Sequence, residues 1–163
     1  MQVGTLCQRL VFTICQSDEI SRAAQIMREK QVGYLVVVEP NPVRGIPRPV
    51  GVLTDRDIVV SVVAREVDPK TVRVGDIMTS NPVLALEWES MEAALHKMRQ
   101  FGVRRLPVVN GYRELVGILA IDDVLTVITG DAQDVVSAIR SGRQMEGESR
   151  PYRPLTAYGF TAM

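Results

Sequence analysis

The segment Gly51 to Asp57 places a hydroxyl and a carboxylate at a spacing suited to binding a sugar. Thr54 follows the apolar run Val50 to Leu53, and Asp57 lies three residues further on, so the pair falls where a strand ends and a helix begins. Such a junction leaves backbone N–H groups unpaired and presents both side chains one helical turn apart. A carboxylate that accepts from two adjacent hydroxyls would clamp a ribose, with Thr54 as a second contact.

The same spacing has a purely structural interpretation, which spacing alone favours. A threonine followed three residues later by an acidic residue is a capping-box arrangement, in which the two side chains satisfy the first N–H groups of a helix. The two interpretations differ in what a Thr54→Ala substitution would change. A lost cap costs ~1 kcal/mol of stability with or without ligand, whereas a lost ribose contact lowers affinity.

Two adjacent arginines, Arg104 and Arg105, precede the apolar run Leu106 to Val109. Planar guanidinium groups bind phosphate oxygens through paired hydrogen bonds. The alternative is an exposed pair of charges on a solvated loop. If the arginines point into the same space as the junction after Leu53, the chain has both a sugar contact and a phosphate contact.

The sequence contains no residues with the spacing of a nucleophile and its base, no glycine-rich phosphate loop and no paired acid and base carboxylates. Its single histidine, His96, and its two cysteines, Cys7 and Cys15, cannot assemble a Cys/His zinc site. We therefore expect no catalytic activity and no metal.

These candidate residues belong to a unit that occurs twice. GVLTDRDIV at residues 51–59 returns as GILAIDDVL at an offset of 66, whereas Met27-Arg28 returns as Met98-Arg99 at an offset of 71. The first copy therefore has five more residues in one internal loop, the proline-rich segment 41–49, which we predict to be exposed and irregular. Duplicated units of this size bury a common face against each other, so a ligand is expected in the cleft between them.

Each copy is predicted to contain a strand, an amphipathic helix, two strands and a closing helix. The helix of the first copy is expected over Asp18–Lys30, with Ser17 or Asp18 as its cap. The two strands that follow each helix are read from β-branched runs at residues 35–38, 50–53, 106–109 and 115–119. This is an α+β fold built from two units, 3–66 and 74–130, followed by a C-terminal helix and tail over 131–163.

The two copies are not chemically equivalent. The second keeps the aspartate of the junction, as Asp123, but has Ala120 in place of the threonine. At the positions of the two arginines the first copy has Gly33 and Tyr34. We expect Ala120, Gly33 and Tyr34 to make the second cleft, which keeps Asp123, a weaker site for a phosphorylated ligand.

The composition excludes several classes of protein. The 163 residues are 46% hydrophobic, which predicts a folded chain, and nineteen basic residues balance nineteen acidic ones without a long basic run. Nucleic-acid binding is therefore disfavoured. No window approaches the ~18 apolar residues of a membrane helix, and no signal segment is evident, so we expect a cytoplasmic protein that does not contact membranes.

Several motifs in the same order in both copies resemble those of a pair of CBS domains, the Bateman module. They are VGDIMT at 74–79, GVRRLPVV at 102–109 and GVLTDRD at 51–57. The resemblance covers residues 3–129 and leaves the C-terminal tail unmatched. It implies two units packed about a pseudo-twofold axis, with clefts that bind AMP, ADP, ATP, S-adenosylmethionine or NAD.

The resemblance also implies which residues contact each part of such a ligand. Thr54 and Asp57 would hold the ribose, and Arg104 and Arg105 would face the phosphates. The adenine would lie beside residues of both copies: Val52, Leu53, Ile77 and Met78.

The function implied is a stand-alone regulatory module without catalytic activity, which senses an adenosine-containing ligand and needs no obligatory cofactor. We expect it to form a homodimer through its closing helices, Asp55–Ala64 and Ile121–Thr129, and to act on a separate regulated protein. The alternative is a ligand-free interaction scaffold in which Thr54 and Asp57 only cap a helix. An enzyme acting on a nucleotide is a third hypothesis, for which the sequence offers only arginines and ribose-type contacts.

Overall fold

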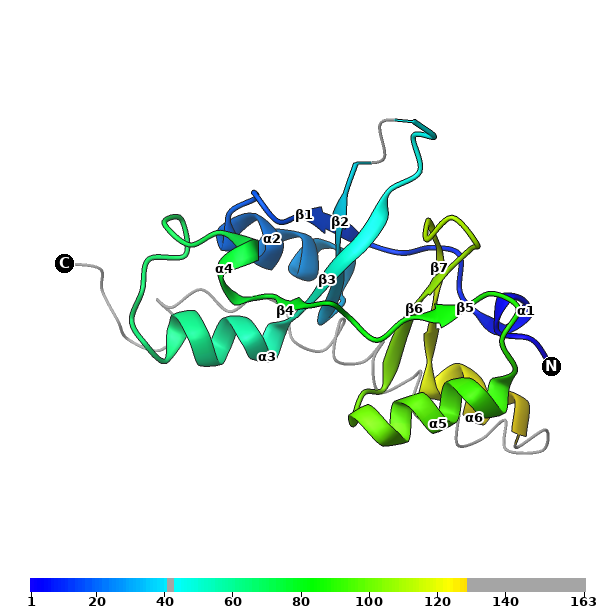
Figure 1. The fold of residues 1–163 in the computed structure, drawn as a ribbon. Coiled ribbons are helices and arrows are strands. Elements are labelled where there is room, and N and C mark those ends of the chain that lie inside the picture. Colours follow the sequence, from blue (N-terminus) through cyan, green and yellow to red (C-terminus); the bar gives the residue numbers. More distant parts are fainter. Residues whose placement is uncertain (41–42, 129–163) are drawn as a thin grey trace. The chain divides into compact units, whose positions relative to one another are not determined.

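A computed structural model describes residues 1–40 and 43–128 of the chain (Figure 1). The first 124 residues form one compact unit, and a second unit begins at Leu125. The helix and tail expected over residues 131–163 lie outside the described residues.

Strands of the two repeats form two separate sheets. The first has the order β1 (Thr13–Cys15), β2 (Tyr34–Glu39), β3 (Arg48–Thr54) and β4 (Thr79–Ser80). β1 pairs with β2 in parallel, and the other pairs are antiparallel. The second sheet has the order β5 (Ala85–Leu86), β6 (Arg105–Val109) and β7 (Leu115–Ala120). The α+β fold with repeated strand-helix-strand-strand-helix units is confirmed.

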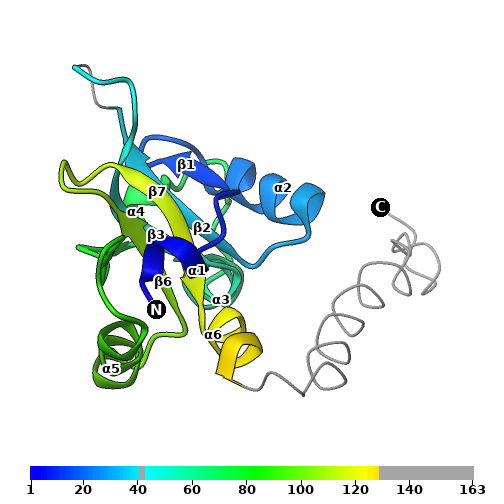
Figure 2. The same ribbon diagram turned by 90° about the vertical axis from the view of Figure 1, so that its right-hand side faces the viewer.

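The helix between the first two strands of each repeat packs on its sheet through one apolar stripe. These helices are α2 (Ile20–Lys30) and α5 (Met91–Phe101), which lie beside β2 and β6 in both views (Figures 1 and 2). The predicted start of α2 was wrong by two residues. Glu19 occupies the N-cap position, but its side chain makes no capping hydrogen bond, and Asp18 instead accepts from the Cys15 amide at 2.9 Å.

The closing helix of the first repeat has two parts. A short α-helix, α3 (Asp55–Ile58), continues as a π-helical segment, η1 (Val59–Val63). Wider turns of this kind place one extra residue in the helix and occur frequently at functional sites. The closing helix of the second repeat is α6 (Ile121–Ile128), which is regular.

The two repeats exchange their lead-in segments, the short helices α1 (Val3–Leu6) and α4 (Val74–Ile77). Val3 is buried in the core of the second repeat, and Val74 in the core of the first. The exchange is held by backbone hydrogen bonds such as that from Gly4 N to Glu87 O, at 2.7 Å. A Cβ on Gly4 would lie 2.8 Å from the same carbonyl, so this close approach requires glycine. Each hydrophobic core therefore needs residues from both copies.

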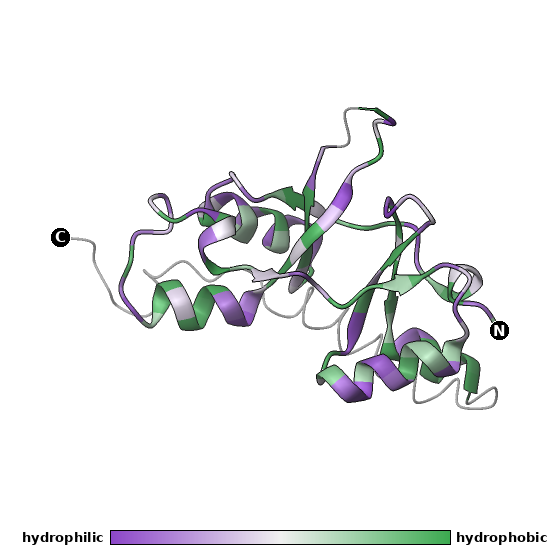
Figure 3. Ribbon diagram, viewed as in Figure 1, coloured by the Kyte–Doolittle hydropathy of each residue, from purple (hydrophilic) through white to green (hydrophobic). Residues whose placement is uncertain are grey.

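Inward-facing β-branched and leucine side chains supply most of both cores. Four consecutive residues of β2 are buried, from Leu35 to Val38, and the strand is coloured hydrophobic over this stretch (Figure 3). On β3 the buried positions alternate with partly exposed ones, so Leu53 faces the core and Val52 faces away from it. This alternation decides which residues of β3 can reach a ligand.

The proline-rich loop of the first repeat is less irregular than predicted. Arg48 and Pro49 belong to β3, and Pro49 lies beside a register shift in the pairing with β2, where a missing N–H is tolerated. The loop also contacts the second repeat: Pro47 O accepts from Leu115 N at 2.9 Å.

A buried carboxylate fixes the same loop to the second repeat. Arg44 Nε lies 2.6 Å from Glu114 Oε1, and the Glu114 side chain is fully buried. The Arg44 guanidinium also lies 3.9 Å from the ring centroid of Tyr112. Arg44 and Pro47 of this loop thus form a clasp between the repeats.

Candidate functional site

A cavity of about 520 Å³ lies between the two repeats, within the first compact unit. Its size is in the range of small-molecule sites. The walls come from the start of β2, the β3–α3 junction, the segment after β4 and the turn between α5 and β6: Gly33, Tyr34, Val52, Thr54–Asp57, Thr79, Asn81–Val83 and Phe101–Arg105.

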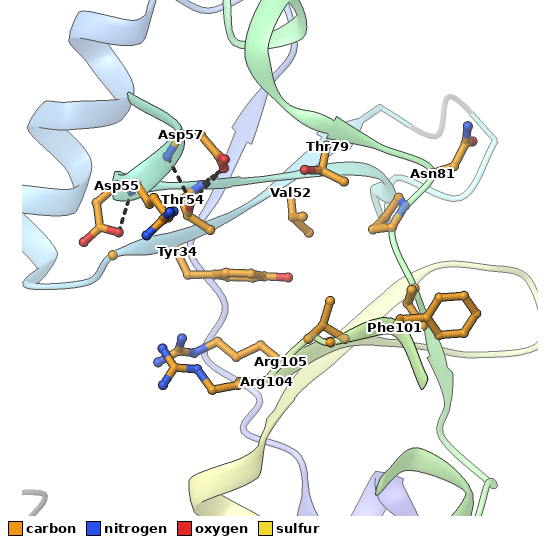
Figure 4. A pocket seen from close by; sticks show the side chains of 16 residues that line it. Tyr34, Val52, Thr54, Asp55, Asp57, Thr79, Asn81, Phe101, Arg104 and Arg105 are labelled. Atoms are coloured by element: carbon orange, nitrogen blue, oxygen red, sulfur yellow. Dashed lines mark hydrogen bonds between the residues drawn. The ribbon is translucent and has the colours of Figure 1, made fainter. Parts of the chain in front are cut away.

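At the first junction, Thr54 and Asp57 form the capping box that their spacing allows. Thr54 Oγ1 accepts from Asp57 N at 3.2 Å, while Asp57 Oδ2 accepts from Thr54 N at 2.8 Å and from Thr54 Oγ1 at 2.7 Å. The two bonds that the carboxylate accepts both use the same oxygen, Oδ2. Within residues 1–40 and 43–128, no group donates to the other oxygen, Oδ1. Asp57 therefore caps the helix and retains an acceptor on the wall of the cavity (Figure 4).

Asp55 brings a second carboxylate into the cavity because residue 33 is a glycine. A Cβ on Gly33 would lie 2.6 Å from Asp55 Oδ2. The backbone of the pair is joined as well, since Asp55 N donates to Gly33 O at 3.1 Å. This part of the wall therefore depends on the absence of a side chain at Gly33.

Arg104 and Arg105 both line the cavity, with their guanidinium groups at the end nearest Asp55 (Figure 4). The Arg105 guanidinium carbon lies 5.7 Å from the ring centroid of Tyr34, within the range of a cation–π contact. The predicted phosphate contacts thus lie in the same cavity as the predicted ribose contacts.

The sequence analysis assigned Gly33 and Tyr34 to the second cleft, and this assignment was wrong: both line this cavity. They align with Arg104 and Arg105, and the equivalent positions of the two repeats face each other here. Burial raises the pKa of the Tyr34 hydroxyl, and this outweighs the lowering caused by the nearby Arg105 charge. Tyr34 is therefore uncharged at neutral pH.

Of the four residues expected beside the base, Val52 alone lines the cavity. Leu53 is fully buried on the opposite face of β3. Ile77 and Met78 pack against the core of the first repeat, and the Met78 sulfur would lie 2.6 Å from a Cβ on Gly51. The second lead-in reaches the cavity through later residues instead.

Sequence reasoning missed several residues of the wall, which fall into two groups. Polar or charged residues missed are Asp55, Arg56, Thr79 and Asn81; apolar residues missed are Pro82, Val83, Phe101 and Val103. Thr79 could have been found, because it ends the VGDIMT motif and β4 pairs it with Val52. The apolar residues carry no local signal that separates a cavity wall from a core.

The second junction differs from the first in the partners of its aspartate. Asp123 Oδ2 accepts from Ala120 N at 2.9 Å, as Asp57 does at the first junction. Its other oxygen, Oδ1, accepts from Gln8 Nε2 at 2.7 Å. Both oxygens of Asp123 are therefore engaged by the protein.

In the part of the chain that the structure describes, no three or more His, Cys, Asp and Glu side chains gather as a metal site would require. No helix among the same residues is long and apolar enough to span a bilayer.

Comparison with known proteins identifies both repeats. The family model described as CBS domain matches residues 3–64 and 74–130. An uncharacterized protein of Methanopyrus kandleri is 36% identical over 129 residues, which are 78% of this chain and 62% of that protein. The chain thus spans less than two thirds of this relative. A CBS domain-containing protein of Bacillus subtilis is 35% identical over 114 residues, which are 70% of this chain and 76% of its own.

Two similar solved structures contain adenosine compounds. A CBS domain protein from Pyrobaculum aerophilum, complexed with AMP, has a TM-score of 0.65 and 29% identity, covering 76% of this chain and 89% of its own. A CBS domain pair in complex with methylthioadenosine and S-adenosyl-L-methionine has a TM-score of 0.66 and 26% identity, covering 78% of this chain and 99% of its own.

Proposed function

The chain belongs to the CBS domain family, and from that premise we propose that its cavity binds an adenosine-containing ligand and that this binding regulates a separate protein. The observation that carries the proposal is the division of the cavity into two ends (Figure 4). One end is charged, and the other, called the apolar end, carries Val52 and Phe101 together with the uncharged polar residues Thr79 and Asn81. An adenine nucleotide is divided in the same way, into an anionic phosphate end and a flat, largely apolar base.

The charged end suits a phosphate bound to a ribose. Arg104 and Arg105 supply guanidinium donors, which match phosphate oxygens in pairs. Oδ1 of Asp57 is the acceptor proposed for the ribose hydroxyls. The capping box supports this role, because it holds the carboxylate in one position before a ligand arrives.

The apolar end suits the base. Val52 and Phe101 line it, and burying a base against such side chains removes apolar surface from water. AMP, ADP or ATP fits the proposal best because of the two arginines. NAD and S-adenosylmethionine share the adenosine part and belong to the same ligand class.

A regulatory role fits these residues better than catalysis does. The hydroxyl and carboxylate that are paired on the wall, those of Thr54 and Asp57, are used in the capping box, and the two arginines would bind and orient a ligand. A ligand would act by binding one state of the assembly more tightly than another, which shifts the population of the two states.

The proposal is tested by thermal unfolding with AMP, ADP, ATP, NAD and S-adenosylmethionine, with GTP as the control. A ligand at a hundred times its Kd adds about 2.7 kcal/mol of stability. Stabilisation by adenine compounds and not by GTP supports the proposal. No stabilisation by any of them at millimolar concentration contradicts it and favours the ligand-free scaffold.

We also propose that a second copy of the chain packs on the closing helix of the first repeat. Val59, Val60 and Val63 of η1 are 54%, 54% and 64% exposed, and this part of the helix is coloured hydrophobic in Figure 3. Exposed apolar strips of this kind mark interfaces. The closing helix also begins at Asp55, on the cavity wall, so a ligand contact there lies next to the proposed interface.

The assembly proposal is tested by light scattering after size-exclusion chromatography. Val60→Lys is expected to lower the molecular mass from a dimer to a monomer, because it buries a charge in the contact. Gln25→Lys, on the exposed side of α2, is the matched control and is expected to leave the mass unchanged. A monomeric unaltered protein would contradict the proposal.

A further inference from the structure

Tyr34 lies between the charged and the apolar end of the cavity. It is the first residue of β2, and its backbone is paired with Thr54 of the neighbouring strand. In Figure 4 its ring lies across the cavity, and its hydroxyl points away from the guanidinium groups of Arg104 and Arg105 toward the side of Phe101. The hydroxyl therefore faces the end assigned to the base.

The Tyr34 hydroxyl is a polar group on the wall of the cavity, carried by a half-buried side chain. Across the described residues, no hydrogen-bond partner satisfies it, and burial keeps it protonated by raising its pKa. A neutral phenol can both donate and accept a hydrogen bond. The hydroxyl lines an open cavity that water can enter, and a polar atom of a ligand can take the place of that water.

The position of the ring is fixed before a ligand binds. Strand pairing holds its backbone, and the Arg105 guanidinium lies over its face at 5.7 Å. One face of the ring is therefore in contact with a charge, and the free edge that carries the hydroxyl is the part presented to the apolar end. A base that enters this end meets the hydroxyl with its polar edge.

We infer that Tyr34 is a specificity-determining residue, whose hydroxyl forms a hydrogen bond with the polar edge of the bound base. This inference rests on the proposed function, since it requires a base in the apolar end. It assigns to Tyr34 the recognition of the base, separately from the ribose and phosphate contacts of Asp57 and the arginines.

The test is calorimetric titration of the unaltered protein and of Tyr34→Phe with AMP and four analogues. The analogues lack ring nitrogen N1, N3 or N7, or the exocyclic amine. Tyr34→Phe is expected to weaken AMP binding about 3- to 10-fold, the effect of one neutral hydrogen bond. One analogue is expected to bind the unaltered protein equally weakly and to show no further loss with Tyr34→Phe, because both changes remove the same bond.

Tyr112→Phe is the matched control, since it also removes a phenol hydroxyl from a ring that contacts an arginine, but outside the cavity. It is expected to bind AMP as the unaltered protein does. Unchanged AMP affinity in Tyr34→Phe would overturn the role of Tyr34 while leaving the proposed function intact. The role of Tyr34 would also be overturned if the loss of affinity caused by Tyr34→Phe added in full to the loss caused by each of the four analogues. Failure of the unaltered protein to bind AMP or any analogue would overturn the proposed function and the inference together.

Discussion

The two strand-to-helix junctions have the same backbone and different chemistry. In both, an aspartate three residues into the helix accepts from the backbone N–H of the residue that ends the strand: Asp57 from Thr54 and Asp123 from Ala120. The second oxygen of Asp57 has no donor among the described residues, whereas that of Asp123 is bound by Gln8. Duplication preserved the cap, which folding needs, and left only one junction with an acceptor for a ligand.

The difference between the junctions originates in the exchanged lead-ins. Gln8 of the first lead-in aligns with Thr79 of the second, and each pairs with the last strand of the repeat it joins, β7 for Gln8 and β3 for Thr79. The long amide of Gln8 reaches the carboxylate of Asp123, and the shorter Thr79 lines the cavity without bonding to Asp57. The side chain at this position of each lead-in, Gln8 or Thr79, therefore determines whether the protein itself binds the second carboxylate oxygen of the facing aspartate.

The largest effect is expected from removing a phosphate contact. Arg105→Met is expected to weaken AMP binding about 10- to 100-fold, because hydrogen bonds to charged groups contribute about 1.5–3 kcal/mol, and to leave adenosine binding nearly unchanged. Calorimetric titration with both ligands measures the difference. Arg99→Met, at an exposed position of α5, is the matched control. Equal losses for AMP and adenosine would show that Arg105 does not contact the phosphate.

Giving the second junction the residues of the first tests which side chains make the two junctions different. The double variant Gln8→Thr with Ala120→Thr frees Oδ1 of Asp123 and adds the missing hydroxyl. We expect its AMP stoichiometry to rise from one toward two per chain in calorimetric titration, with the second event at least 10-fold weaker because Arg104 and Arg105 have no equivalents there. Unchanged stoichiometry would mean that Gln8 is not what closes the second junction.

The clasp between the repeats, made by Arg44 and Pro47, is expected to stabilise the folded chain. Arg44→Met removes the ion pair to the buried Glu114 and is expected to lower the free energy of unfolding by about 1–3 kcal/mol, since Asn110 still donates to the carboxylate. Denaturant unfolding measures this loss. Arg48→Met, an exposed arginine of the same loop and strand, should change stability by less than about 0.5 kcal/mol. Equal effects of the two substitutions would argue against the clasp.

The smallest effect is expected from the cap alone. Thr54→Ala removes one capping hydroxyl and is expected to cost ~1 kcal/mol of stability. The reverse change at the second junction, Ala120→Thr, adds the hydroxyl and should stabilise by a similar or smaller amount. Thermal unfolding without ligand compares them, and a loss well above 2 kcal/mol in Thr54→Ala would require a role for Thr54 beyond the cap.

The sequence predicted those features that depend on neighbouring residues. The runs at 35–38 and 106–109 became strands because β-branched residues suit a buried, pleated surface. The spacing of Thr54 and Asp57 predicted the capping box that is observed, because such a cap joins residues within one helical turn. The place of Arg104 and Arg105 on the cavity wall was anticipated only through the resemblance to CBS domains.

Features that depend on tertiary contacts escaped prediction. Tyr34 was noticed in the sequence but assigned to the wrong cleft, because spacing does not tell which equivalent positions face each other across the repeats. The exchange of lead-ins sent Ile77 and Met78 to a core rather than to the cavity. The closing of Asp123 by Gln8 joins residues 115 positions apart, and no local pattern marks it.

The most direct test of the difference between the junctions is a matched pair of substitutions, Asp57→Asn and Asp123→Asn. An asparagine keeps an acceptor for the capping N–H, so both variants are expected to fold with similar stability. In calorimetric titration with AMP, we predict that Asp57→Asn binds at least 10-fold more weakly than the unaltered protein and that Asp123→Asn binds as tightly. Equal affinity of both variants, or a loss confined to Asp123→Asn, would contradict the account.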